Sequence, residues 1–157
     1  MNLAPFAFQL PSSYLPFVQL LTDLGMQESP TFSRMQQLLF EMQNACGYQR
    51  LNPNELRAVF KILDFLCEID TYKQSNHLAE SSIVPDDAGR LVHAHSCVYI
   101  DGAGSRMVGK IDTSRLRFVH PLLKENNCIL LGIRKLSDIV EEVLYNLHCA
   151  VSLSSIS

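Results

Sequence analysis

The feature that most constrains the fold is a change in hydrophobic spacing near the middle of the 157-residue chain. Before position 71 the apolar residues recur three and four apart, which is typical of amphipathic helices. After position 82 they come in short runs between turn residues, which is typical of strands. We predict an α+β chain whose lobes pack together: a helical lobe at 1–72, a linker at 73–82 and a mixed α/β lobe at 83–157.

The first two predicted helices begin near serine or threonine and end at glycine. Ser12 or Ser13 can cap a helix that Gly25 ends. The segment 29–31 (SPT) predicts a second start, because proline is tolerated in the first helical turn, and Gly47 ends that helix. Their apolar faces comprise Leu15, Phe17 or Val18, Leu21 and Leu24 in the first helix, and Met35, Leu38, Leu39 and Met42 in the second. We interpret the methionines as core residues.

The third helix has the clearest start signal in the sequence. Asn52 can cap it, Pro53 suits the first helical position, and Glu55 can reach back to the cap. The apolar face behind this start is broad, so we expect the three helices to pack on one another and the third to contact a further neighbour. That face comprises Leu56, Val59, Phe60, Leu63, Phe65, Leu66 and Ile69.

The second half predicts a small, mostly antiparallel sheet with C-terminal helices. The segment 86–89 (DDAG) is a turn sequence, and 90–100 predicts one or two strands after it. A glycine-containing loop and a strand at 116–120 follow. A short helix at 128–131 would end at Gly132, and Ser137 would cap a last helix at 138–147.

The composition excludes several classes of protein. With 47% hydrophobic and 18% charged residues, the chain is neither a disordered tail nor a membrane protein. A formal net charge of −3 gives no general attraction for nucleic acid or anionic lipid. The five cysteines include no CxxC pair, which argues against a disulfide framework, and we predict no signal peptide at the N-terminus. We expect a cytoplasmic or nuclear protein without nucleic-acid or membrane partners.

The segment from Gly104 to Lys110 has the glycine and lysine spacing of a phosphate-binding P-loop. In a P-loop the next residue is Ser or Thr and holds magnesium, whereas here it is Ile111. The residues that follow do not predict the required helix. We interpret the segment as a glycine-rich loop, and keep a small nucleotide-binding enzyme with a degenerate P-loop as the alternative function.

His93, His95 and Cys97 are spaced two apart, so in a continuous strand their side chains would share one face. Such a set could bind zinc, but a structural site needs a fourth ligand. The candidates for it have no recognisable companion spacing: His77, Cys67, His120 and Cys128. A zinc-stabilised module is therefore a third hypothesis, and the preferred interpretation is half-buried histidines with a small core cysteine.

Two further constellations have simpler explanations. Cys97, His120 and Asp101 could form a nucleophilic triad, but sequence gives no geometry and no GxSxG motif occurs. A cluster of basic residues has no aromatic side chains beside it on which nucleic-acid bases could stack. Alternation along a strand would place Arg115 and Arg117 of this cluster on a solvated face. The cluster comprises Arg106, Lys110, Arg115 and Arg117.

Both halves of the chain resemble a sacsin repeat, most closely those of plant sacsin-like proteins. In the first half the resemblance rests on Leu10-Pro11, Tyr14, Phe17, Leu20-Leu21, Leu24-Gly25, Pro30-Thr31, Leu51-Asn52, Glu55-Leu56 and Ile62-Leu63. In the second half it rests on Val84-Pro85-Asp86, Gly89, Leu91, Cys97, Tyr99, Asp101, Val119-His120-Pro121, Leu131-Gly132-Ile133 and Leu136-Ser137. Residues 102–108 lack the aromatic residue usual in the family, and the tail after Leu147 departs from its pattern.

The resemblance implies a chaperone-related chain, here a fragment or divergent copy of the segments that follow the ATP-binding fold. That fold's signatures, an Asn-bearing helix and a DxGxG loop, are not in this sequence, so no ATPase residue is carried over. We expect a non-catalytic interaction segment that binds neighbouring modules, chaperones or client proteins. We expect no catalytic, cofactor-binding or metal-ligating residue.

Overall fold

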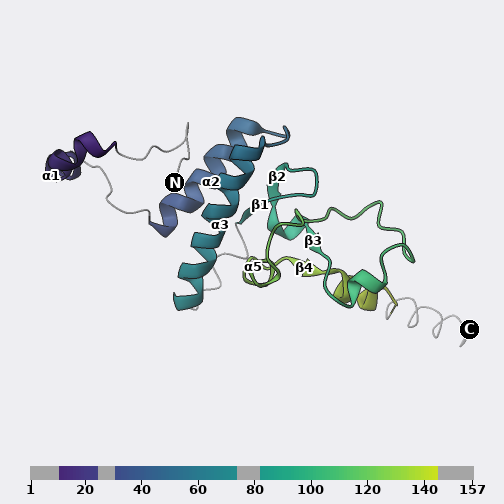
Figure 1. Ribbon diagram of the computed structural model, residues 1–157. Helices are drawn as coiled ribbons and strands as arrows, with labels where there is room; N and C mark the ends of the chain where they lie inside the picture. The colour runs from purple at the N-terminus through teal and green to yellow at the C-terminus, as the bar shows by residue number, and fades with distance from the viewer. Residues whose placement is uncertain (1–10, 25–30, 74–81, 145–157) are drawn as a thin grey trace, which may run out of the picture.

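The computed structural model describes residues 11–24, 31–73 and 82–144, and it has the α+β order expected from the sequence (Figure 1). Two long helices, α2 (Phe32–Cys46) and α3 (Pro53–Lys73), pack against each other beside two small pairs of strands. A short helix, α5 (Glu125–Leu130), and a last helical segment at 136–144 follow in the second half.

Helix α2 forms as predicted. The Thr31 side chain caps it by accepting a hydrogen bond from the Arg34 N–H, and Gly47 ends it with a positive φ of 55°. The face predicted to be buried is buried: Met35, Leu38, Leu39 and Met42. The two methionines are therefore core residues.

Helix α3 begins with the predicted capping box. The Asn52 side chain accepts hydrogen bonds from the N–H groups of Asn54 and Glu55, and the Asn52 N–H donates to the Glu55 carboxylate at 2.8 Å. The helix is buried on a wide face because α2 covers one side while strand β1 (Ile83–Pro85) and α5 cover others. The further neighbour that its sequence required is thus confirmed.

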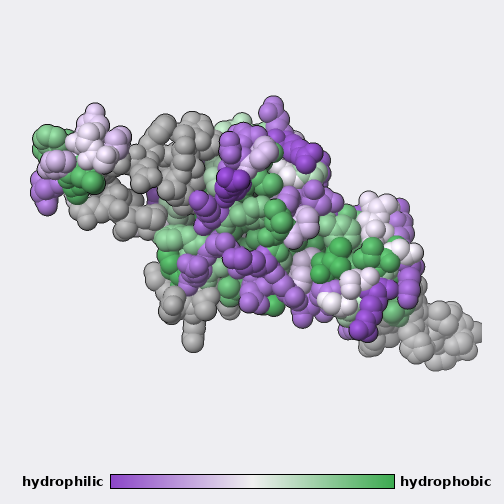
Figure 2. Space-filling view, viewed as in Figure 1, coloured by the Kyte–Doolittle hydropathy of each residue, from purple (hydrophilic) through white to green (hydrophobic). Residues whose placement is uncertain are grey.

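The segment before α2 differs from the prediction. A 3₁₀ helix, η1 (Ser12–Phe17), leads into α1 (Val18–Asp23); the N-cap residue is Pro11, and no side chain caps it. Pro16 lies inside η1 and lacks the N–H of a regular helix. Neither piece buries a residue, so the expected packing of this helix on the other two is wrong in the structure. The segment lies away from α2 and α3, and its apolar side chains are at the surface (Figures 1 and 2).

The predicted turn joins the two strands of an antiparallel hairpin, β1 (Ile83–Pro85) and β2 (Leu91–His93). The Gly89 N–H donates to the Asp86 carbonyl, the Asp86 N–H donates to the Arg90 carbonyl, and Gly89 has a φ of 78°. This is a three-residue hairpin loop with glycine at the left-handed position.

The second pair of strands is parallel, so the sheet is less uniformly antiparallel than the sequence suggested. Strand β3 (Val98–Tyr99) pairs with β4 (Arg134–Lys135), and a 3₁₀ turn, η2 (Ala94–Ser96), separates β2 from β3. The strand expected at 116–120 is reduced to bridges at Phe118 and Val119. Another 3₁₀ turn, η3 (Gly104–Arg106), lies in the glycine-containing loop.

One buried cluster contains residues of both predicted lobes, from Leu38 and Ile62 on the helices to Val84 and Leu131 in the mixed half. The lobes thus pack together. Helix α3 runs to Lys73, so the predicted linker begins inside a helix, and positions 74–81 lie outside the described residues. The boundaries at 72 and 83 stay a prediction. In the described part of the chain, no helix is long and apolar enough to cross a membrane.

Candidate functional site

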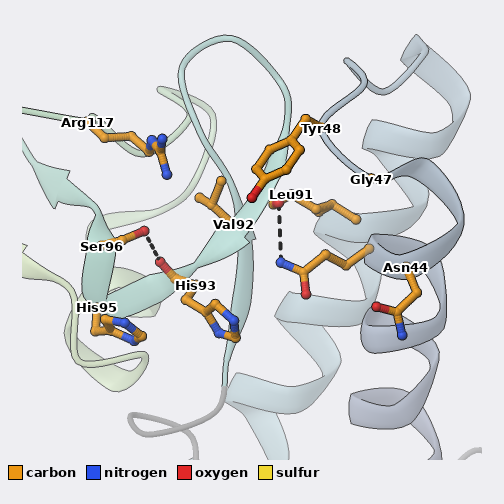
Figure 3. Close-up of a pocket in the computed structure, with 10 residues that line it drawn as sticks. Asn44, Gly47, Tyr48, Leu91, Val92, His93, His95, Ser96 and Arg117 are labelled. Atoms are coloured by element: carbon orange, nitrogen blue, oxygen red, sulfur yellow. Dashed lines mark hydrogen bonds between the residues drawn. The ribbon is translucent and has the colours of Figure 1, made fainter.

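A cavity of about 410 Å³ lies between the end of α2 and the outer edge of β2 (Figure 3). Arg117 lies on one side of Leu91 and Val92, and Tyr48 and Asn44 lie on the other. We call this cavity the β2-edge pocket. It combines backbone groups of a strand with polar side chains of three other segments.

The hydrogen bonds of the hairpin determine which β2 groups face the β2-edge pocket. At one end of the ladder the Asp86 N–H donates to the Arg90 carbonyl, and at the other the Ala94 N–H donates to the Ser82 carbonyl. Because bonded pairs alternate in an antiparallel ladder, Val92 bonds with Val84. The backbone groups of Leu91 and His93 therefore point away from β1, along the outer edge of β2.

Side chains form hydrogen bonds with only some of the backbone groups on this outer edge. The Gln43 Nε2 donates to the Leu91 carbonyl at 3.3 Å, and the Ser96 hydroxyl donates to the His93 carbonyl at 2.6 Å (Figure 3). Among the described residues, the outward N–H groups of Leu91 and His93 donate to no acceptor. The two-stranded sheet has no third strand on this side in the described residues.

Arg117, beside the β2-edge pocket, is only loosely paired with a carboxylate. The Asp86 carboxylate is fully buried, and Arg90 binds it with Nη2 at 2.8 Å and Nε at 2.9 Å. It also accepts hydrogen bonds from the N–H groups of Ala88 and Arg90. The Arg117 Nε lies farther from the same carboxylate, at 3.9 Å. Two guanidinium groups thus share one carboxylate, and Arg117 is the less engaged of the two.

The proposed zinc face does not form, because the strand ends at His93 and η2 turns the chain. The rings of His93 and His95 stack with centroids 5.4 Å apart, and both side chains are exposed, whereas Cys97 is buried. The predicted alignment of His93, His95 and Cys97 is therefore wrong. Among the described residues, no group of three His, Cys, Asp or Glu side chains could hold a metal ion.

The segment from Gly104 to Lys110 lacks the geometry of a P-loop. A P-loop joins a strand to a helix and leaves its N–H groups open to phosphate. Here a single 3₁₀ turn is followed by turn and bridge residues, and Lys110 is exposed. The N–H groups of Ala103 and Gly104 donate to the Asp101 carboxylate. The loop is folded around its own aspartate.

Cys97, His120 and Asp101 are each engaged elsewhere. Burial raises the pKa of the Cys97 thiol to about 11, so it is not a thiolate at neutral pH. Burial, with the Arg50 charge, lowers the pKa of His120, whose Nδ1 accepts from the Leu122 N–H and whose ring contacts Phe60 edge-on. The Asp101 carboxylate accepts from Ser137 and Gly104.

The basic cluster is solvated, as predicted. Arg106, Lys110 and Arg115 are exposed, and the Arg117 side chain retains 44% of its accessible surface. The sequence did not assign Arg117 to a pocket. Arg117 reaches the pocket because the chain at 117–119 lies beside the hairpin, where the Asp87 N–H donates to the Phe118 carbonyl. The sequence carries no local signal for this contact.

The comparisons with known proteins give no relatives. No protein-family model matches this chain, and no curated protein or solved structure is significantly similar to it.

Proposed function

We propose that this chain is a non-catalytic interaction segment of a sacsin-like, chaperone-related protein, and that it binds protein partners. The observation that carries the proposal is the β2-edge pocket, where two backbone donors of a strand, which have no acceptor among the described residues, line a cavity. Backbone groups of this kind recognise other polypeptides. The family assignment rests on the sequence resemblance.

The chemistry of the candidate nucleophile supports a non-catalytic role. Cys97 is 1% exposed, and burial raises the pKa of its thiol to about 11. A nucleophilic cysteine requires the opposite, a lowered pKa in an accessible place. The carboxylate that a triad would need is bonded to Ser137 and Gly104 instead. We therefore propose that the chain acts through binding, in the cytoplasm or nucleus.

An array of unbiased ten-residue peptides tests this function. An interaction segment should bind a subset of the peptides, and the same peptides in solution should compete with that binding. The purified chain should also unfold at the same temperature with and without Mg-ATP. A ligand at a hundred times its Kd would stabilise the chain by about 2.7 kcal/mol, which is several degrees.

The matched control for nucleotide binding is Lys110→Ala, since Lys110 is exposed and donates to no described side chain. A thermal shift with Mg-ATP that disappears in this variant would contradict the proposal and support the P-loop alternative. Failure of every peptide on the array to bind would also contradict the proposal.

A further inference from the structure

We propose that the outer edge of β2 binds an extended, acidic peptide segment of a partner protein as an added strand. This inference rests on the proposed interaction function and names the class of partner and the way it is held. In strand addition, main-chain hydrogen bonds give affinity and alternate side chains give specificity.

The spacing of the outward groups fits an extended peptide. Leu91 and His93 are two residues apart on β2, so their outward N–H groups are about 7 Å apart, the repeat of an extended chain. Their carbonyl oxygens each accept one side-chain hydrogen bond and have a second lone pair. A peptide lying along this edge would pair both N–H groups.

The other edge of the hairpin, on β1, is covered beside the turn by the chain at 118–120. On β1, Pro85 has no N–H, and its carbonyl accepts a hydrogen bond from the His120 N–H at 2.9 Å. The Asp87 N–H donates to the Phe118 carbonyl, and Asp86 bridges Val119. Proteins commonly cover or block a sheet edge to prevent unwanted pairing. Here the chain at 118–120 covers the edge from Pro85 to Asp87, whereas a cavity lies beside the outer edge of β2.

The charge at the β2-edge pocket selects the class of peptide. Arg90 already binds the buried Asp86 carboxylate at 2.8 Å, whereas Arg117 is exposed and lies 3.9 Å from it, so its guanidinium is open to a carboxylate of a partner. Side chains of an added strand would alternate between the side of Arg117 and the side of Tyr48 and Asn44 (Figure 3). Glutamate or aspartate suits the first side and an apolar residue the second, because Tyr48 presents an exposed ring there.

The test measures the Kd of a fluorescent peptide of sequence TEVEVEVT by anisotropy, with wild-type protein and two variants at one position. His93→Pro removes an outward N–H without disturbing the ladder to β1. His93 already has a φ of −68°, which proline requires. His93→Ala keeps the N–H and removes the imidazole. We expect His93→Pro to weaken binding about fivefold to tenfold relative to His93→Ala.

Two matched comparisons test the strand geometry and the charge. In an added strand, every second peptide N–H points toward β2. Peptides N-methylated at those residues should lose binding, whereas peptides N-methylated at the residues between them should keep it. Arg117→Gln should weaken binding about threefold or more and reduce its salt dependence, whereas Arg115→Gln, also exposed, should change little. The peptide TKVKVKVT should bind more weakly than the acidic one.

Equal binding by His93→Pro and His93→Ala, or equal loss in both methylation phases, would overturn the inference. Binding of other peptides on the array but not of the acidic one would also overturn it, while leaving the proposed interaction function intact. A wild-type dimer that becomes a monomer in His93→Pro, measured by light scattering, would assign the edge to a second copy of this chain instead. Circular dichroism and thermal unfolding of both variants confirm that they are folded.

Discussion

The carboxylate of Asp101 holds Ser137 across 36 residues of chain, accepting from its N–H at 3.3 Å and from its hydroxyl at 2.9 Å. Ser137 lies in the first turn of the helical segment 136–144, where backbone N–H groups lack partners within the helix. The same carboxylate accepts from the Gly104 N–H at 3.1 Å. Asp101 thus fastens the start of the last helix to the glycine-containing loop, a role the sequence had assigned to Ser137 itself.

Asp101→Ala should lower the free energy of unfolding by about 1–2 kcal/mol, as loss of a capping side chain does. Burial raises the pKa of Asp101, but hydrogen bonds from Ser137 and Gly104 outweigh it, and the net pKa is lowered. The ionised form therefore stabilises the fold above the unfolded pKa of about 4, and this contribution is lost as pH falls through the lower folded pKa.

Urea unfolding at several pH values measures the effect. The difference between wild type and Asp101→Ala should be constant above about pH 5 and should shrink below about pH 4. Glu141→Ala is the control, since Glu141 is exposed in the same last helix and no hydrogen bond joins its carboxylate to a described residue. A difference that does not depend on pH would contradict the assigned role of the carboxylate.

Asn52→Ala should destabilise the protein by about 1 kcal/mol, because it removes the acceptor for the N–H groups of Asn54 and Glu55 at the start of α3. Asn54→Ala is the matched control: its side chain is exposed, while its backbone bond to the cap remains. Chemical unfolding of the two variants measures the difference. Equal stabilities would show that the capping box contributes little to this fold.

Asp86→Ala should destabilise the protein by about 2–4 kcal/mol, because it leaves two N–H groups of the turn and the Arg90 guanidinium without their buried acceptor. Asp86→Asn keeps an oxygen acceptor and loses the charge, so its loss should be smaller. Neighbouring Asp87→Ala, at an exposed position, should change stability by less than about 0.5 kcal/mol. Similar losses in the Asp86 and Asp87 variants would contradict this account.

Alkylation by iodoacetamide at pH 8 should distinguish the cysteines. Burial raises the pKa values of Cys97 and Cys128 to about 11, and both are 1% exposed, so these thiols should react slowly in the folded protein. Cys46, which is partly exposed, should react earlier. Mass spectrometry of peptides from a time course measures each rate. Fast labelling of Cys97 in the folded chain would revive its interpretation as a nucleophile.

Local signals explain which parts of the fold the sequence predicted. The capping box at Asn52, the buried face of α2 and the DDAG turn each depend on residues within a few positions of one another. The parallel pairing of β3 with β4 joins Val98 to Arg134 and has no local signature. The N-terminal segment differs from the prediction because amphipathic spacing shows only that one face of a helix could be buried. Which element would cover that face depends on residues elsewhere in the chain.

The candidate site was harder to predict than the fold, because it depends on register. Spacing alone suggested that His93, His95 and Cys97 share a face, but η2 interrupts the strand after His93 and rotates the later side chains. The pairing register of β2 with β1 also turns the Leu91 and His93 backbone groups outward. A shift of one residue would have turned these groups toward β1. Burial of Asp86 likewise depends on Arg90 and on the chain at 117–119, which sequence does not place together.

Tyr99→Phe should leave stability within about 0.5 kcal/mol of wild type or raise it. The Tyr99 hydroxyl is buried and has no hydrogen-bond partner among the described residues, so deleting it removes an unpaired polar group. Burial, with the nearby Glu125 charge, raises its pKa, which keeps the hydroxyl neutral at pH 7. Tyr48→Phe, at an 89% exposed side chain, is the matched control and should have almost no effect. A loss of more than about 1.5 kcal/mol in Tyr99→Phe alone, measured by urea unfolding, would show that the hydroxyl has a partner in solution.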